Sequence, residues 1–215
     1  MQENKKNNLL RRFIAAAILI PLVVAAIVLS KPLLQTIIIV VAIGMLVEWY
    51  DMTHQDICYM ILGVPIIAIP MSCLMVISMI MSDYKYILLT YASMVWSVDS
   101  AAMFGGKRFG GPRLAPVLSP NKTWSGLGCG MIGASLVAMV LSQLPGFEFP
   151  YRGVHLVIFA MILAVIAQIS DLFISFFKRK FDIKDTGSII PGHGGILDRC
   201  DSLILTAPVM LWVVM

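Results

Sequence analysis

The sequence predicts an all-α integral membrane protein, a polytopic helix bundle with about seven transmembrane helices. Of its 215 residues, 59% are hydrophobic and only 13% are charged, and the mean hydropathy is +0.89. Soluble globular proteins carry about 25% charged residues, so this composition indicates a membrane protein. The apolar residues also form separate runs of the length that a membrane-spanning helix needs. We therefore expect a basic cytoplasmic start over residues 1–12 and a single transmembrane catalytic domain over residues 13–215.

The first four predicted helices each carry a distinguishing feature. The first follows a basic start, which is also typical of a signal peptide, but no cleavage site precedes a soluble domain. The second ends in Trp49 and Tyr50, which suit the membrane interface. The third contains Pro65 and Pro70, which predict a kink or a break. The fourth carries Asp99 near its end. These four runs cover residues 13–30 and about 33–49, 57–81 and 84–104.

Three further runs complete the predicted bundle. They cover about 124–144, 153–177 and 202–215. The fifth helix is rich in Gly and Ala, which favour close packing against a neighbouring helix. The seventh has only 14 residues, which is short for a crossing, so we expect it to be tilted or incomplete.

The distribution of basic residues supports seven crossings. With the amino terminus in the cytoplasm, thirteen of the sixteen Lys and Arg lie inside and three lie outside, as the positive-inside rule requires. Splitting the run at 57–81 into two crossings would move both basic loops to the opposite side, so we reject that topology. An additional helix elsewhere keeps eight crossings as an alternative.

Ten of the 28 charged side chains lie within residues 171–202, where an even spread would place about four. On a helix, Asp171, Ser175 and Lys178 would share one face that leads out of the membrane. Carboxylates at helix ends beside a Gly-rich basic loop suit a hard divalent cation and its phosphate ligand. The stretch is therefore the first candidate for a functional site.

A Gly- and Pro-rich loop divides this stretch. Its composition disfavours helix between about 185 and 195 and lets a ligand approach the backbone. We expect a helix to restart near Leu197, with Asp198 and Asp201 on its first turn. His193, in the loop, could contact phosphate or a base.

The loop over residues 105–123 is the second polar concentration. Its Gly and Pro residues predict irregular structure, and its four Lys and Arg supply positive charge. Ser119 and Thr123 flank the start of the fifth helix, where free N–H groups favour an anion. A cytoplasmic loop is also basic when membrane topology alone requires it. An anion-binding loop and a loop with a purely topological role therefore both stay open.

Asp99 and Asp171 fall inside predicted spans. An ionised carboxylate there costs at least a few kcal/mol unless it is paired, coordinated or hydrated. Metal ligation and an ion pair with a basic loop residue both satisfy this requirement. The four cysteines have neither metal-ligand nor paired spacing and are predicted to be packed apolar residues.

Three runs with fixed spacing resemble the signature of the phosphatidate cytidylyltransferases, also called CDP-diacylglycerol synthases. They are SFFKR from Ser175, KDTG from Lys184 and PGHGGILDRCD from Pro191, together spanning 27 positions. The segment from Asp99 through SPNKT at 119–123 resembles the family's other cytoplasmic motif, and Glu48 with Trp49 resembles a weaker one. The chain departs from the family pattern at Asn121 and Ser125.

The resemblance implies transfer of a cytidylyl group from CTP to phosphatidic acid in the bilayer, giving CDP-diacylglycerol and pyrophosphate. It also implies a bacterial inner-membrane protein whose site faces the cytoplasm and binds no nucleic acid; a homodimer is left open. Mg²⁺, with a second cation as an option, is predicted to bind Asp171, Asp198, Asp201 and Asp99. The predicted catalytic positions are Asp171, Asp185, Asp198, Asp201 and Lys184. Predicted substrate contacts are Ser119, Lys122, Thr123, Ser175, Lys178, Arg179, His193 and Arg199.

Other functions predict different patterns. A CTP-dependent polyprenol kinase or a related lipid nucleotidyltransferase shares part of the signature, but the complete run favours the phosphatidate enzyme. An ion or solute transporter would place acidic residues near the bilayer midplane and show an inverted repeat. Here the charges gather at one face and no repeat is evident. A CDP-alcohol phosphotransferase would need a DGxxAR pattern, which the sequence lacks.

Overall fold

The computed structural model describes residues 20–144, 146–187 and 194–215. The first part contains a helix at Ile20–Leu29, α2 at Lys31–Thr53, α3 at Ile57–Ile80 and α4 at Tyr84–Phe109. A hairpin of β1 at Arg113–Ala115 and β2 at Ser119–Thr123 then leads into α5 at Trp124–Leu141. The remaining helices are α6 at Gly153–Lys180, the one-turn α7 at Leu197–Cys200, and α8 at Leu203–Val214.

Each predicted apolar run overlaps one of these helices, so the prediction of a helical membrane protein is confirmed. Five helices in the described ranges are long and apolar enough to cross a membrane, namely α2 to α6, and Ile20–Leu29 and α8 are apolar but shorter. Helix α3 continues as one helix through Pro65 and Pro70, so of the predicted kink or break, the break does not occur.

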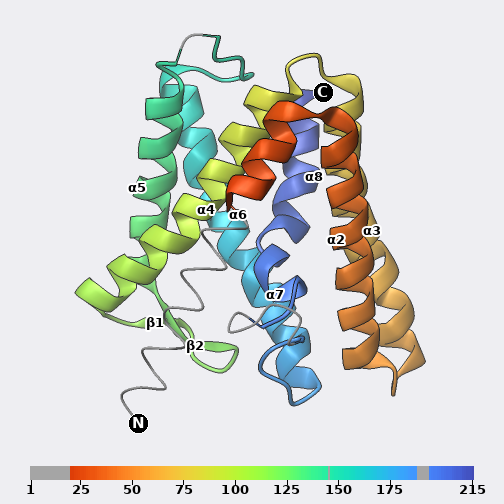
Figure 1. Ribbon diagram of the computed structural model, residues 1–215. Coiled ribbons are helices and arrows are strands. Elements are labelled where there is room, and N and C mark those ends of the chain that lie inside the picture. The colour runs from red at the N-terminus through yellow and green to blue at the C-terminus, as the bar shows by residue number, and fades with distance from the viewer. Residues whose placement is uncertain (1–19, 145, 188–193) are drawn as a thin grey trace, which may run out of the picture.

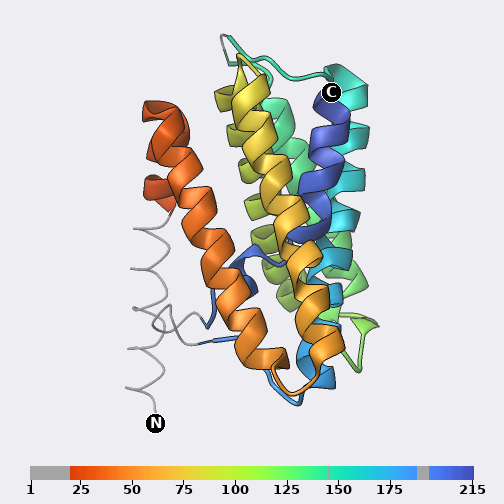
Figure 2. The same cartoon turned by 90° about the vertical axis from the view of Figure 1, so that its right-hand side faces the viewer.

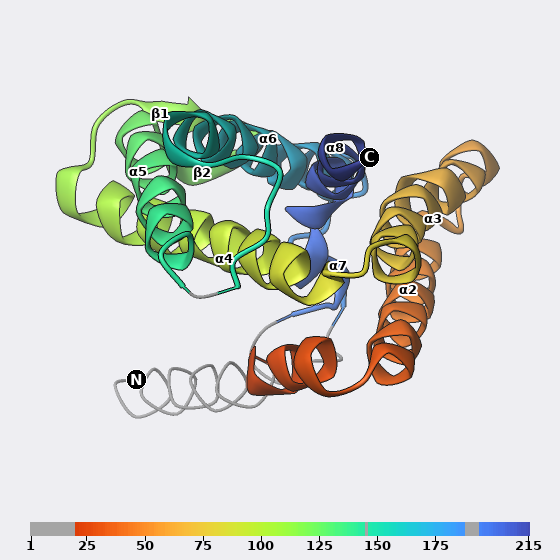
Figure 3. The ribbon, with the colours of Figure 1, turned by 90° about the horizontal axis from the view of Figure 1, so that it is seen from above.

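The long helices alternate in direction and form a layered bundle (Figure 1). Helices α2 and α3 pair on one side, α4, α5 and α6 pack on the other, and α8 lies between α3 and α6 (Figure 3). The hairpin, the chain after α6 and α7 gather toward the lower end in Figure 1. Residues 194–202, which include α7, form a polar segment that reaches across to α2 (Figure 2).

Positive charge is concentrated at the end of the bundle that holds the hairpin. Twelve Lys and Arg lie in the described residues, and nine belong to elements at this end. The nine are Lys107, Arg108, Arg113, Lys122, Lys178, Arg179, Lys180, Lys184 and Arg199. The other three are Lys31, Lys85 and Arg152, at the opposite end. The two ends of the bundle therefore differ in charge as the positive-inside rule predicts.

The prediction of irregular structure over residues 105–123 was wrong in two respects. Helix α4 runs on to Phe109 and ends at Gly110, whose φ of 61° lies in the left-handed region. The following residues form the antiparallel hairpin, which pairs Arg113 with Thr123 and which the all-α class does not include. Gly105 and Gly106 do not end the helix, because they face α5 and the residue before it, where larger side chains would not fit.

The Gly-rich face of α5 packs closely against α4, as its composition predicts. A Cβ atom at Gly126 would lie 2.8 Å from the Ala102 carbonyl oxygen, and one at Gly133 would lie 2.6 Å from the Ala101 Cβ. Both distances are too short for ordinary contact. The small residues therefore let the two backbones approach each other and bring β2 to the end of α4.

Trp49 anchors the contact between α2, α3 and α6. Its indole is 1% exposed, donates from Nε1 to the Tyr59 carbonyl oxygen at 2.9 Å, and packs edge-on against Phe177 at a centroid distance of 5.0 Å. The indole lies directly over Gly63, so that a Cβ atom there would overlap the ring. This contact fixes α2 against α3 near the polar end of the bundle.

We expect Gly63→Ala to destabilise the protein by about 1–3 kcal/mol, because the added methyl forces Trp49 to move within a packed core. Thermal unfolding in detergent, followed by tryptophan fluorescence, measures the effect. Gly128→Ala is the matched control, because that position is also helical but no described atom outside its own helix backbone lies within 4 Å of the added Cβ. Equal melting temperatures for the two variants would contradict the prediction.

Candidate functional site

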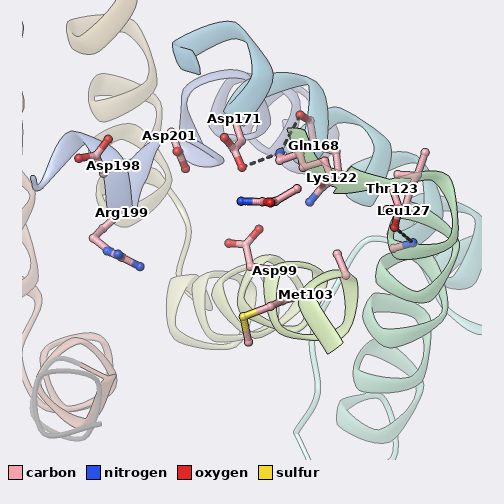
Figure 4. A pocket seen from close by; sticks show the side chains of 13 residues that line it. Asp99, Met103, Lys122, Thr123, Leu127, Gln168, Asp171, Asp198, Arg199 and Asp201 are labelled. Atoms are coloured by element: carbon pink, nitrogen blue, oxygen red, sulfur yellow. Dashed lines mark hydrogen bonds and ion pairs between the residues drawn. The ribbon is translucent and has the colours of Figure 1, made fainter. Parts of the chain in front are cut away.

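A cavity of about 300 Å³ opens at the polar end of the bundle, between α4, β2, α5, α6 and the polar segment. Its charged lining consists of Asp99, Lys122, Asp171, Asp198, Arg199 and Asp201. The other lining residues are Ala102, Met103, Asn121, Thr123, Gly126, Leu127 and Gln168. Asp99 and Asp201 thus line the same cavity, although they are 102 positions apart in the sequence (Figure 4). This cavity is the candidate active site.

Asp171 enters the cavity from α6 and pairs with the hairpin. Lys122 Nζ lies 2.5 Å from Asp171 Oδ2 and also donates to the Gln168 carbonyl oxygen at 3.4 Å (Figure 4). Ser175 Oγ donates to Asp171 Oδ1 at 3.3 Å. The predicted shared face of Asp171 and Ser175 is confirmed, and the ion pair attaches β2 to α6.

Asp198 is held by three donors. Lys178 Nζ donates to its Oδ1 at 2.8 Å, and the N–H groups of Thr186 and Gly195 donate to its Oδ2 at 2.8 and 3.0 Å. Burial disfavours the ionised carboxylate, but the hydrogen bond and charge of Lys178, with the two amides, outweigh it and lower the pKa of Asp198. Asp198 therefore remains charged and ties α6 to the polar segment.

Asp99 and Asp201 reach the cavity from α4 and from the turn before α8 (Figure 4). Ser202 lies between them, with Oγ 3.5 Å from both Asp99 oxygens and from Asp201 Oδ1. Asp201 is 8% exposed, and burial together with the charge of Asp171 raises its pKa well above the usual range. A cation in the cavity would remove this penalty, so the carboxylates form an environment suited to positive charge.

Several predicted site residues lie beside the cavity without lining it. Lys178 and Ser175 hold Asp198 and Asp171, as described above. Arg179 donates from Nε to the Leu118 carbonyl oxygen and from Nη1 to the Ile183 carbonyl oxygen, both at 3.2 Å. It therefore fastens the hairpin to the end of α6.

The remaining predicted residues divide between the cavity, the hairpin and the chain after α6. Thr123 lines the cavity but caps α5, since its Oγ1 accepts from the Gly126 N–H at 3.0 Å. Ser119 pairs with Ala115 in the hairpin and does not line the cavity. Lys184 and Asp185 are exposed and also do not line it. His193 lies outside the described residues.

Gln168 and Asn121 line the cavity but were not predicted as site residues. Each had a sequence signal, because Gln168 is a polar residue in an apolar run one helical turn before Asp171, and Asn121 precedes Lys122.

Glu48 was noted in the sequence only as part of a weak motif, yet it is 1% exposed and binds the polar segment. Its Oε1 accepts from the Ile196 N–H, and its Oε2 accepts from the Leu197 N–H, each at 2.8 Å. The available sequence signal was an acidic residue near the end of an apolar run. The sequence could not show its partners Ile196 and Leu197, which are almost 150 residues away.

The carboxylates fit a hard cation in their chemistry. Asp99, Asp171 and Asp201 supply oxygen ligands, which Mg²⁺ prefers, in one partly closed cavity. Across the described ranges, however, no three His, Cys, Asp or Glu side chains stand close enough together to form a ready metal-binding group. Metal ligation by these residues therefore stays a prediction.

Comparison with known proteins shows one consistent similarity. A model of the cytidylyltransferase family matches residues 55–215. A phosphatidate cytidylyltransferase of Rickettsia bellii is 53% identical over 188 residues, which are 85% of this chain and 80% of the relative. The enzyme of that name from Rickettsia felis is 51% identical over 85% of this chain and 82% of its own length. A phosphatidate cytidylyltransferase of Brucella suis is 43% identical over 55% of this chain and 43% of its own length.

Proposed function

Because the chain belongs to the cytidylyltransferase family, we propose that it transfers a cytidylyl group from CTP to phosphatidic acid, giving CDP-diacylglycerol and pyrophosphate. The observation that carries this function is the cavity in which Asp99, Asp171 and Asp201 meet Lys122 and Arg199 at the basic end of a membrane bundle. Both substrates are anionic, and a site for them needs fixed positive charge at the membrane surface. The family membership and this geometry favour cytidylyl transfer over lipid kinase and transporter functions.

The reaction needs no nucleophile from the protein. A phosphate oxygen of phosphatidic acid attacks the α-phosphorus of CTP, a new P–O bond forms, and the bond to the β-phosphate oxygen breaks to release pyrophosphate. The main barrier that the protein can lower is repulsion between two polyanions. Lys122 and Arg199 are placed to bind phosphate oxygens, and the ion pair with Asp171 orients the Lys122 ammonium.

We further propose that Mg²⁺, with a second cation as a further option, binds at this cavity. Asp171, Asp201, Asp99 and Asp198 are the proposed ligands. A bound Mg²⁺ supplies charge neutralisation and alignment of the phosphates. Asp198 can take part only by sharing its Oδ1 with Lys178, since both of its oxygens already accept hydrogen bonds.

We propose seven crossings of the bacterial inner membrane, with the cavity facing the cytoplasm. The nine basic residues at the cavity end, against three at the opposite end, support this orientation. Met103 lines the cavity and is 48% exposed. This position supports a lateral opening through which a lipid head group enters while its acyl chains stay in the bilayer. A homodimer stays a prediction. Measuring the mass of the purified protein in detergent tests it.

The decisive experiment follows two labels of CTP. Purified protein is incubated with phosphatidic acid, Mg²⁺ and CTP labelled at either the α- or the γ-phosphate. Cytidylyl transfer places the α-label in the lipid and the γ-label in pyrophosphate. A γ-labelled lipid would identify a kinase instead, and the absence of any labelled lipid would overturn the proposal.

Replacing Lys122 with Met should raise the apparent KM for CTP or phosphatidic acid by about 10- to 100-fold. This factor corresponds to the free energy of one charge-assisted hydrogen bond. The Lys122 ammonium pairs with Asp171 at the cavity, and this variant removes it. Initial rates against each substrate measure the change. Lys107→Met, an exposed basic residue at the end of α4, is the control and should keep both values. Unchanged KM values in Lys122→Met would show that Lys122 binds neither substrate and that the charge of the hairpin serves only membrane topology.

A further inference from the structure

We infer that Glu48 is a positioning residue for this reaction, because it fixes from α2 the polar segment that carries Asp198, Arg199 and Asp201. The inference rests on the proposed cytidylyl transfer for its kinetic consequences. Glu48 itself does not line the cavity. Any effect on the reaction must therefore pass through the backbone that it holds.

The Glu48 carboxylate is buried and fully engaged with the chain around the polar segment. In addition to the two amides of Ile196 and Leu197 at 2.8 Å, its Oε2 accepts from Thr186 Oγ1 at 3.1 Å. Its residue exposure is 1%. An ionised group in such a place is stable only when several donors replace its water, and three donors do so here.

Asp198 also binds the two stretches of chain that Glu48 binds, residues 186–187 and 195–197. Thr186 donates its N–H to Asp198 and its hydroxyl to Glu48. Gly195 donates its N–H to Asp198, while the next two amides bind Glu48. The stretches 186–187 and 195–197 are thus held between two carboxylates, one from α2 and one from the polar segment.

The two glycines of these stretches permit the approach. A Cβ atom at Gly187 would lie 2.6 Å from Glu48 Oε1, and a Cβ atom at Gly195 would overlap Glu48 Oε2. Only residues without side chains leave room for the carboxylate at both positions. The sequence predicts that the glycines of this loop let a ligand approach the backbone. Gly187 and Gly195 instead make room for the Glu48 side chain.

The contacts require a carboxylate of this length. In Glu48→Gln, one oxygen becomes an NH₂ group that must face an N–H or hydroxyl donor, so at least one contact is lost and a donor is left unpaired. The volume is unchanged. The variant therefore tests the acceptor function without creating a cavity.

The first experiment compares Glu48→Gln with wild type by kinetics and by hydrogen–deuterium exchange. We expect kcat to fall by about 10- to 100-fold, as for other residues that orient a site indirectly, with the KM for CTP changed much less. Amides in 194–201 should exchange faster, whereas those in α5 should not change. Thr53→Val is the matched control, because Thr53 is buried on the same helix and its hydroxyl donates to the Trp49 carbonyl oxygen of that helix.

The inference is overturned if Glu48→Gln keeps wild-type kcat and exchange, or if exchange rises equally in all helices, which would indicate a general loss of stability. Thr186→Val provides a second test that does not depend on the folding of Glu48→Gln. On its own it removes the hydroxyl donor to Glu48, so it should lower kcat and speed exchange in 194–201. Its effect on kcat should not multiply with that of Glu48→Gln, because the hydroxyl acts through the Glu48 carboxylate. Fully multiplicative effects would contradict the inference.

The two proposals fail in different ways. Absence of labelled lipid from wild-type protein overturns the proposed function. Normal wild-type turnover with an unaffected Glu48→Gln variant overturns the positioning role alone. The exchange measurement reports on the Glu48 contacts whatever the reaction is.

Discussion

Replacing Asp171 with Asn should lower cytidylyl transfer by about 10²–10³-fold or more, the scale on which loss of one preorganised charged contact acts in an active site. The substitution keeps the side-chain volume but removes the charge that lies 2.5 Å from Lys122 Nζ. The Lys122 ammonium loses its orientation, and the proposed cation loses a ligand. Turnover of α-labelled CTP at saturating phosphatidic acid, in detergent and in liposomes, measures the loss.

The matched control is Asp182→Asn. Asp182 is exposed just beyond the end of α6 and does not line the cavity, so the same change in charge should leave turnover at the wild-type level. Thermal unfolding of both variants shows whether the fold is intact. An Asp171→Asn protein with wild-type turnover would remove Asp171 from the reaction.

Asp198→Asn should cause two losses, one of activity and one of stability. The side chains of Asp198 and Lys178 are 8% and 10% exposed, and breaking a buried ion pair by removing one partner costs about 3–5 kcal/mol. The amide that replaces the carboxylate must also face donors on both sides. We expect a lower melting temperature together with loss of turnover, the latter measured at a temperature where the variant is still folded.

A double variant separates the two losses. Adding Lys178→Met to Asp198→Asn removes the unpaired buried charge, so part of the stability should return while turnover stays low. Additive losses of stability would show that the two side chains do not interact as the structure indicates. Normal turnover by Asp198→Asn would exclude that carboxylate from the proposed ligands.

Much of the bundle could be predicted because hydropathy depends on local sequence. Seven apolar runs predicted seven helices, and the Gly-rich run predicted the close contact of α5 with α4. The extension of α4 to Phe109 could not be predicted in this way, because Gly105 breaks a helix by local propensity but fits one when it faces α5. The hairpin likewise depends on tertiary contacts, such as that of Arg179 with Leu118.

The candidate site was predicted in its residue types but not in its pairings. Helical spacing correctly placed Ser175 beside Asp171, whereas Lys178, on the same predicted face, binds Asp198. Which carboxylate a lysine meets depends on how the polar segment folds back, and spacing within one helix contains no such information. The role inferred for Glu48 has the same origin, since the hydrogen-bond partners that the structure describes for it belong to another part of the chain.

The polar segment before α8 has a consequence for solvent. Three successive amides of this segment, those of Gly195, Ile196 and Leu197, donate to the carboxylates of Asp198 and Glu48. Irregular backbone is tolerated in a membrane bundle only where protein buries it or where it lines a water-filled cavity. These carboxylates therefore let the polar end of the bundle meet water and a water-soluble nucleotide without exposing unpaired amides to hydrocarbon.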